Sequence, residues 1–302
     1  MPAGGATGQA LRKSGPGDFA TAWGGALRLD REAAVPASPA DGAILFTRSQ
    51  AGRQRPSFLA PAGAAAGIQT LLASHKIGWW GAAGGSATAQ SVGLVGTVTG
   101  TATARTVATD NLFKSTRRLG IVSGNTAGLT AGLRDGGVGK YWRGTAPKLG
   151  GFEYVVRFGI SAYSAGMRVA VGLLATVSLL PNADPSAQTN AVFLGKNAAD
   201  TTFRIMHNDG AGACTVVDLG PDFPADTQEV DLYEARFFCA PNGDRIGVSV
   251  ERLNTGHVAE ATLTADLPDA GTLLGLQIWL NNGAAAASVA LDIVSQYIET
   301  DY

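Results

Sequence analysis

Residues 152–158 read Phe-Glu-Tyr-Val-Val-Arg-Phe, and residues 167–173 read Met-Arg-Val-Ala-Val-Gly-Leu. In both stretches a large apolar residue occupies every second position, which is the period of a β-strand with one buried face. Further short runs of this kind follow as far as residue 298, separated by turn sequences such as Asn208-Asp209-Gly210. About ten short strands without a long helix between them predict an antiparallel β-sandwich, jelly-roll-like, over residues 150–302.

The alternation also predicts which side chains fill the space between the two sheets of this sandwich. The expected core residues are Phe152, Tyr154, Val156, Phe158, Met167, Val169, Val171, Ile246, Val248, Val250, Leu276 and Ile278. Parallel strands are disfavoured, because the sequence offers no crossover helices to connect them.

The first 40 residues have a different character. Glycines interrupt every candidate element there, and a segment with so much backbone freedom loses too much entropy to fold alone. We expect residues 1–40 to form an extended arm that becomes ordered against a partner chain. Its expected anchors are the large apolar side chains Leu11, Phe19, Trp23 and Leu27.

Residues 41–149 are expected to form a small mixed α/β connector. Residues 42–48 and 53–59 are predicted strands, with Pro56 limiting the second to a sheet edge. Residues 64–75 carry Ile68, Leu71 and Leu72 at helical spacing and predict a short helix. The Gly-rich segments 81–85 and 132–139 are read as flexible loops.

Composition narrows the classes of protein that this chain can belong to. Its 302 residues are only 16% charged and carry a formal net charge of −1, which is unlike a nucleic-acid binder or a polybasic membrane anchor. No apolar run is long enough to span a bilayer, and no signal peptide is visible. The two cysteines are expected to be small apolar core residues, consistent with synthesis in a reducing cytoplasm.

The N-terminal arm carries a motif that resembles bacteriophage tail fibres. Residues 5–13 read Gly-Ala-Thr-Gly-Gln-Ala-Leu-Arg-Lys and are followed by Asp18-Phe19 and Trp23-Gly24. Weaker similarities follow in the same order along nearly the whole chain, among them Arg117-Arg118-Leu119-Gly120 and Leu253-Asn254-Thr255-Gly256-His257. The chain therefore resembles phage fibre or virion structural proteins.

This resemblance implies a homotrimeric virion fibre, made in the host bacterial cytoplasm. Its N-terminal part would dock onto other tail or baseplate proteins, which gives Leu11, Phe19 and Trp23 a docking role. Its C-terminal β-domain would meet a glycan or protein of the host surface. The resemblance fixes no residue of the receptor site.

We searched the sequence for catalytic, metal and cofactor sites and expect none. His75, His207 and His257 lie in no metal-ligand spacing, and the Gly-rich segments lack the Gly-Lys-Ser/Thr of a phosphate loop. Glycan cleavage needs two carboxyl groups about 5 to 9.5 Å apart. The acidic residues that cluster between Asp218 and Glu234 are the candidates for such a pair. Loop acids of this kind are usually solvated charges or turn formers, so we expect a protein that is not an enzyme.

Aromatic residues in loops are the better candidates for a binding site, because sugars stack their apolar faces on flat rings. Tyr141 and Trp142 lie in a Gly-rich loop, and Tyr163 lies in the turn 161–166. These three are the predicted receptor-binding residues. Packing of Tyr141 and Trp142 between subunits or domains is the alternative.

The resemblance and the composition together favour a non-enzymatic phage tail fibre subunit that attaches to the host surface by multivalent binding. Two alternatives stay open. One is a capsid fibre or decoration protein without a receptor role, and the other is a polysaccharide-degrading tailspike.

Overall fold

The computed structural model describes the chain in several segments, which together form two compact units. The described residues are 10–13, 21–24, 36–37, 39–41, 43–59, 65–67 and 76–300. One unit comprises residues 1–50 and 54–70, and the other comprises residues 51–53 and 71–302.

The first unit contains short antiparallel strands. β1 (Ala10–Lys13) pairs antiparallel with β2 (Thr21–Gly24), so two short stretches of the arm form strands where none was predicted. A three-stranded sheet has the order β3 (Ile44–Gln50), β4 (Arg53–Leu59) and β5 (Ala65–Gly67). The helix expected over residues 64–75 is wrong at β5, and residues 68–75 lie outside the described residues.

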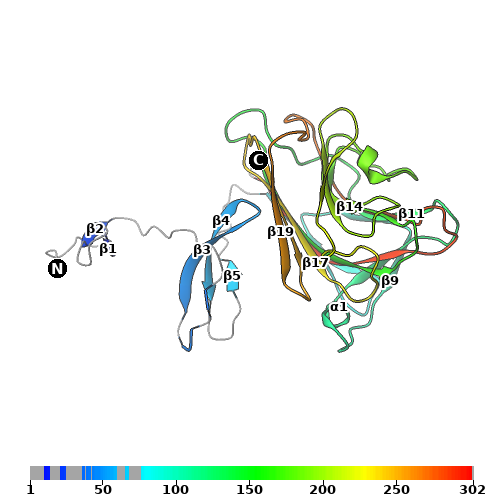
Figure 1. The fold of residues 1–302 in the computed structure, drawn as a ribbon, viewed down its shortest axis with the longest axis horizontal. Helices are drawn as coiled ribbons and strands as arrows, with labels where there is room; N and C mark the ends of the chain where they lie inside the picture. The colour runs from blue at the N-terminus through cyan, green and yellow to red at the C-terminus, as the bar shows by residue number, and fades with distance from the viewer. Residues whose placement is uncertain are drawn as a thin grey trace. The chain divides into compact units, whose positions relative to one another are not determined.

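The second unit is a β-sandwich of two antiparallel sheets (Figure 1). We call the nine-stranded one the front sheet. Along its main path it contains β19 (His257–Leu263), β18 (Ile246–Arg252), β17 (Tyr233–Cys239), β12 (Phe152–Ala162), β21 (Ala290–Thr300), β10 (Leu119–Val122) and β9 (Thr101–Ala104). β6 (Lys76–Ala82) pairs with the C-terminal half of β21 and with β7 (Ala89–Val92).

We call the seven-stranded one the back sheet. In order it contains β16 (Thr215–Asp218), β15 (Arg204–Asn208), β14 (Ala191–Lys196), β13 (Arg168–Leu174), β20 (Gly275–Asn281), β11 (Thr130–Asp135) and β8 (Gly96–Thr99). The mainly β, antiparallel sandwich predicted from the alternating stretches is therefore confirmed.

The sandwich extends further toward the N-terminus than the expected boundary at residue 150. Strands β6, β10 and β11 of the expected connector pair with strands of the C-terminal part, and β7, β9 and β8 pair with these three in turn. Residues 132–135 of the expected flexible loop belong to β11. Gly132 fits this strand because a Cβ atom there would lie 2.7 Å from the carbonyl oxygen of Ile278.

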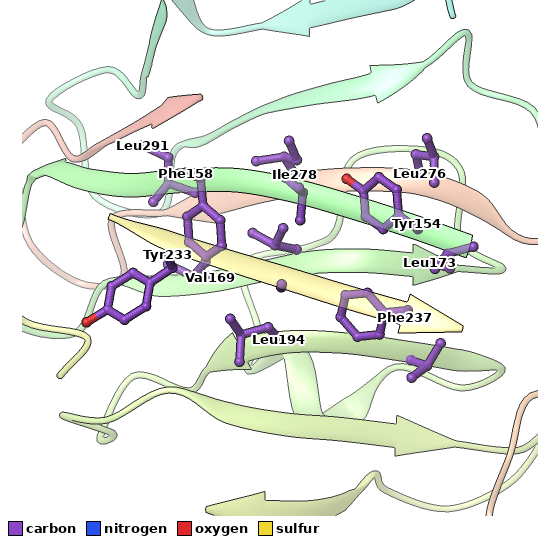
Figure 2. Packing of buried hydrophobic residues seen from close by; sticks show 14 of the residues in the cluster. Tyr154, Phe158, Val169, Leu173, Leu194, Tyr233, Phe237, Leu276, Ile278 and Leu291 are labelled. Carbon is purple, nitrogen blue, oxygen red and sulfur yellow. The ribbon is translucent and has the colours of Figure 1, made fainter. Parts of the chain in front are cut away.

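The core lies between the two sheets (Figure 2). Tyr154 and Phe158 of β12 and Phe237 of β17 point from the front sheet toward Val169 of β13 and Ile278 of β20. All twelve predicted core residues belong to this cluster. Burial of each large apolar side chain contributes about 1.5 to 3 kcal/mol relative to leaving it in water.

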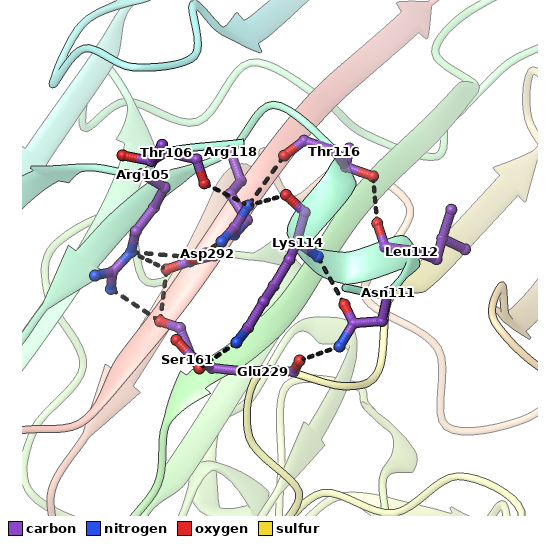
Figure 3. A network of polar contacts seen from close by, with 10 residues as sticks. All are labelled: Arg105, Thr106, Asn111, Leu112, Lys114, Thr116, Arg118, Ser161, Glu229 and Asp292. Carbon is purple, nitrogen blue, oxygen red and sulfur yellow. Dashed lines mark hydrogen bonds and ion pairs between the residues drawn. The ribbon is translucent and has the colours of Figure 1, made fainter. Parts of the chain in front are cut away.

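A buried polar network fixes the segment between β9 and β10 against the front sheet (Figure 3). The fully buried carboxylate of Asp292 on β21 accepts from Arg105 Nε and from Arg118 Nε, each at 2.9 Å, and from the hydroxyl of Ser161. The short helix α1 (Leu112–Ser115) lies in this segment, and the Asn111 side chain caps it by accepting from the Lys114 backbone N–H.

Candidate functional site

The structure places Tyr141 inside the sandwich. Its side chain is only 6% exposed, and its hydroxyl donates to Asp135 Oδ2 at 2.8 Å. Burial, and then the neighbouring Asp135 carboxylate, raise the pKa of Tyr141 well above its usual range. The ring therefore has no open face on which a sugar could stack, which differs from the exposed loop position expected from the sequence.

Trp142 and the predicted docking residues lie elsewhere. Trp142 is partly exposed, and its carbonyl oxygen accepts from the Gly151 backbone N–H. Leu11 and Trp23 are register partners in the β1–β2 hairpin, while Phe19 lies outside the described residues. The receptor role of Trp142 and the docking role of the other three stay predictions.

Tyr163 is the predicted residue around which other polar side chains gather. It follows the end of β12, and the Lys196 ammonium at the end of β14 lies over its ring, 5.2 Å from the centroid. The backbone N–H of Tyr163 donates to Gln228 Oε1 at 3.1 Å. Tyr163 and Gln228 therefore lie in loops, and Lys196 is the last residue of a strand that ends beside them.

Carboxylates surround this position. Asp184, Asp200 and Asp226 all interact electrostatically with Lys196, and Asp226 also acts on Tyr163. We call Tyr163, Lys196, Asp184, Asp200 and Asp226 the end-loop cluster. Its loops are held together by backbone hydrogen bonds between the segments 201–203 and 223–225.

Burial dominates the electrostatics of Lys196. Its side chain is fully buried, and burial lowers the pKa of its ammonium to about 8, although the three aspartates oppose the shift. A lysine with a lowered pKa is often a nucleophile. Here, however, Nζ donates to the Met167 carbonyl at 2.7 Å beneath the ring of Tyr163, so the amine supports the ring instead of facing a substrate.

Burial and the nearby Asp226 carboxylate raise the pKa of Tyr163, so its hydroxyl stays protonated at neutral pH. The ring is partly exposed, with carboxylate and amide groups beside it. Chemically, this arrangement offers an apolar stacking surface with hydrogen-bonding groups around it, which suits a sugar ring.

Four of the acidic residues between Asp218 and Glu234 form ion pairs with lysine or arginine side chains, and one of the four is Glu229, which pairs with Lys114. Glu234 is nearly buried between Arg157 and Arg236, whose charges hold the pKa of its carboxyl below its usual range. Asp218 pairs with Arg204, and Asp231 pairs with Arg252. A general acid for glycan cleavage needs a raised pKa, which is the opposite direction to the shift at Glu234.

The two cysteine thiols and the possible metal ligands remain to be considered as reactive or ligand-binding groups. Burial raises the pKa of the Cys214 thiol to about 12 and that of the Cys239 thiol to about 11, as expected for apolar packing residues. Among the described residues, no group of three or more His, Cys, Asp or Glu side chains is placed to hold a metal ion. Within the same residues, no helix has both the length and the apolar character needed to cross a membrane.

Comparisons with known proteins return similarities of fold only. No protein-family model and no curated protein matches this chain. Peanut lectin aligns at 9% identity over 75% of this chain and 97% of its own, with a TM-score of 0.47. A protein of unknown function from Shewanella oneidensis MR-1 aligns at 14% identity over 77% of this chain and 90% of its own, with a TM-score of 0.48.

A phage protein is also among the similar structures. The CBM2 module of the evolved Dit of Lactobacillus casei BL23 phage J-1 aligns at 15% identity over 61% of this chain and 77% of its own, with a TM-score of 0.39. With TM-scores below 0.5, none of these similarities says what this chain binds.

Lys196 was not predicted from the sequence. Nor were three neighbouring residues of the back sheet, Arg134, Gln277 and Trp279, whose side chains each hold a buried polar atom without a hydrogen-bond partner among the described residues. For Gln277 and Trp279, the alternation of residues along the strand could have shown that they lie on its outer face. Gln277 and Trp279 alternate with the core residues Leu276 and Ile278, so the alternation puts a tryptophan on the face that points away from the core. Lys196 offered no such signal, because its partners come from loops far away in the sequence.

Proposed function

We propose that this chain is a non-enzymatic phage tail fibre subunit that attaches to a glycan of the host surface through the end-loop cluster. The observation that carries this proposal is the partly exposed ring of Tyr163, held on Lys196 and surrounded by carboxylate and amide groups. The opening motif of residues 5–13 supports the fibre assignment.

The proposal includes a homotrimer that resides in the virion and docks through its N-terminal arm to tail or baseplate proteins. Three copies raise the effective concentration of weak sites, so a modest affinity at each end-loop cluster is sufficient for attachment. Light scattering on the purified full chain measures the mass, and a monomer at micromolar concentration contradicts the trimer.

The test of the binding site compares two substitutions of one residue. Tyr163→Ala removes the stacking surface and should weaken attachment to host cells about tenfold, whereas Tyr163→Phe keeps the ring and should retain attachment. The melting temperature of both variants should stay near that of the wild-type chain, because the ring lies at the margin of the core.

Two outcomes contradict the proposal. Attachment of Tyr163→Ala at wild-type strength removes the end-loop cluster from the receptor site. Release of oligosaccharides from the host glycan by the wild-type chain identifies a tailspike instead.

A further inference from the structure

The outer face of the back sheet is covered by a long connection between β13 and β14. We call residues 175–190 the strap. It packs on a second cluster of buried residues, which is separate from the main core and includes Leu174, Phe193, Met206 and Trp279. The strap contains the short 3₁₀ helix η1 (Pro185–Ala187).

The strap is held by hydrogen bonds to side chains and backbone groups outside it, and by burial of its own Leu180 in the second cluster. Arg168 Nε donates to Asp184 Oδ1 at 2.6 Å, and the Ser186 N–H donates to Asn197 Oδ1 at 3.2 Å. A backbone hydrogen bond joins the Cys214 N–H to the Ser186 carbonyl. Such a segment can separate from the sheet without breaking a strand ladder.

Near its beginning, the strap lies over three adjacent residues of the sheet. Arg134 on β11 is the register partner of Gln277 on β20, and Trp279 is two residues further along the same strand and on the same face. Arg134 Nη1 donates to the carbonyl of Val177 at 3.0 Å. Gln277 Nε2 donates to the carbonyls of Thr176 and Ser178, at 2.6 and 3.0 Å.

The same three side chains each hold a buried polar atom that lacks a hydrogen-bond partner within the described part of the chain. These atoms are Arg134 Nε, Gln277 Oε1 and Trp279 Nε1. Gln277 and Trp279 are 1% and 0% exposed. Buried polar atoms are almost always paired in native proteins, because leaving one unpaired is costly, so three on neighbouring residues need an explanation.

We propose that Arg134, Gln277 and Trp279 form a second saccharide subsite, which the strap occupies with its own peptide carbonyls and vacates for an N-acetylated sugar. The peptide groups of residues 176–178 are amides, and the acetamido group of such a sugar offers the same carbonyl acceptor to Arg134 and Gln277. The sugar ring stacks on the indole of Trp279, and its hydroxyls reach the unpaired atoms.

The residue opposite Trp279 supports this assignment. It is Gly132, which has no side chain beside the indole; a Cβ atom there would lie 3.6 Å from Leu179 Cδ2 of the strap. On that side, the indole of Trp279 is therefore next to backbone atoms only. Displacement of the strap exposes the indole.

Calorimetric titration of the full chain with N-acetylglucosamine and with glucose tests the proposal. We expect binding of N-acetylglucosamine and at least about tenfold weaker binding of glucose, which lacks the acetamido group. Gln277→Ala should weaken N-acetylglucosamine about tenfold, and Gln90→Ala on the exposed face of β7 is the matched control. Asn182→Ala removes the hydrogen bond from Arg168 Nη1 to the strap, at a residue outside both the subsite and the end-loop cluster, and should tighten binding about threefold or more.

Hydrogen exchange of the wild-type chain gives a readout that needs no variant. N-acetylglucosamine should speed exchange of the amides of Ser186 and Cys214, because their hydrogen bonds join the strap to residues outside it. Equal affinity for the two sugars, unchanged affinity of Gln277→Ala, or absence of binding to both the wild-type chain and Asn182→Ala overturns the proposal.

This inference does not depend on the proposed attachment through the end-loop cluster. Tyr163→Ala should leave the affinity for N-acetylglucosamine unchanged, so failure of either proposal can be recognised separately.

Discussion

Asp292 carries a charge that is fully buried between the strands of the front sheet and the segment that covers them (Figure 3). Two arginine side chains and one hydroxyl compensate it, and these come from Arg105, Arg118 and Ser161. Removal of one partner from such a site is costly, because the charges that remain are still buried.

We predict that Asp292→Asn lowers the free energy of unfolding by about 3 kcal/mol or more. The amide keeps the size of the side chain but leaves the guanidinium groups of Arg105 and Arg118 without their anion. Denaturant unfolding measures the effect. Asp244→Asn is the control, since Asp244 forms an exposed pair with Arg245, and it should leave the unfolding midpoint unchanged. Equal midpoints for both variants contradict this prediction.

The lowered pKa of the Lys196 ammonium predicts how the free energy of unfolding depends on pH. Its ammonium has a pKa of about 8 in the folded chain, whereas an unfolded lysine has about 10.4. The unfolded state therefore binds more protons between these values, so this group makes the folded state more stable as pH rises from about 8 to 10.4.

The measurement compares the wild-type chain with Lys196→Met over this pH range. The difference in free energy of unfolding should shift in favour of the wild-type chain by on the order of 2 kcal/mol. Other titrating groups are common to both chains and cancel in the difference. A constant difference from pH 7 to 10.5 contradicts the lowered pKa.

At the scale of single elements, β18 and its neighbour β19 illustrate the two faces of a sandwich strand. Val248 on β18 is fully buried in the core between the sheets, whereas Val258 on the edge strand β19 is 56% exposed. We predict that Val248→Asp costs about 3 kcal/mol or more, because it puts an unpaired charge between the sheets. Val258→Asp should change the melting temperature little. Thermal unfolding of both variants tests this, and equal losses contradict it.

The strands that the sequence predicts well are those with a strict alternation of large apolar residues. The predicted core residues Ile246, Val248 and Val250 lie in β18, and the stretch 152–158 lies within β12. β11 was missed because Thr130-Ala-Gly-Leu-Arg-Asp contains small residues of low β-propensity, and its glycine is dictated by a neighbouring carbonyl group on β20. That constraint exists only in the folded sheet.

The candidate site was predictable only in part, for a related reason. Tyr163 was found because an aromatic residue in a short turn is conspicuous. Tyr141 has the same appearance in the sequence, but its hydroxyl reaches Asp135 and its ring joins the core. Whether a loop aromatic folds inward depends on distant partners, which local composition does not reveal.

At the scale of the whole molecule, the sandwich contains its own core. Among the described residues, the members of this core cluster lie between Trp80 and Ile298, and residues 1–40 contribute to none of them. The N-terminal residues belong to the other compact unit. Folding of the sandwich and docking of the arm should therefore be separable.

We predict that a chain lacking residues 1–40 keeps the melting temperature of the sandwich but is not incorporated into the virion. The deletion removes no side chain of the main core, so the free energy of unfolding should change by less than about 1 kcal/mol, which corresponds to less than about 4 °C for a domain of this size. Calorimetry of the truncated and full chains measures the first part, and immunoblotting of purified particles measures the second. A larger fall in melting temperature assigns part of the arm to the sandwich. Normal incorporation removes the docking role from Leu11, Phe19 and Trp23, because all three are absent from the truncated chain.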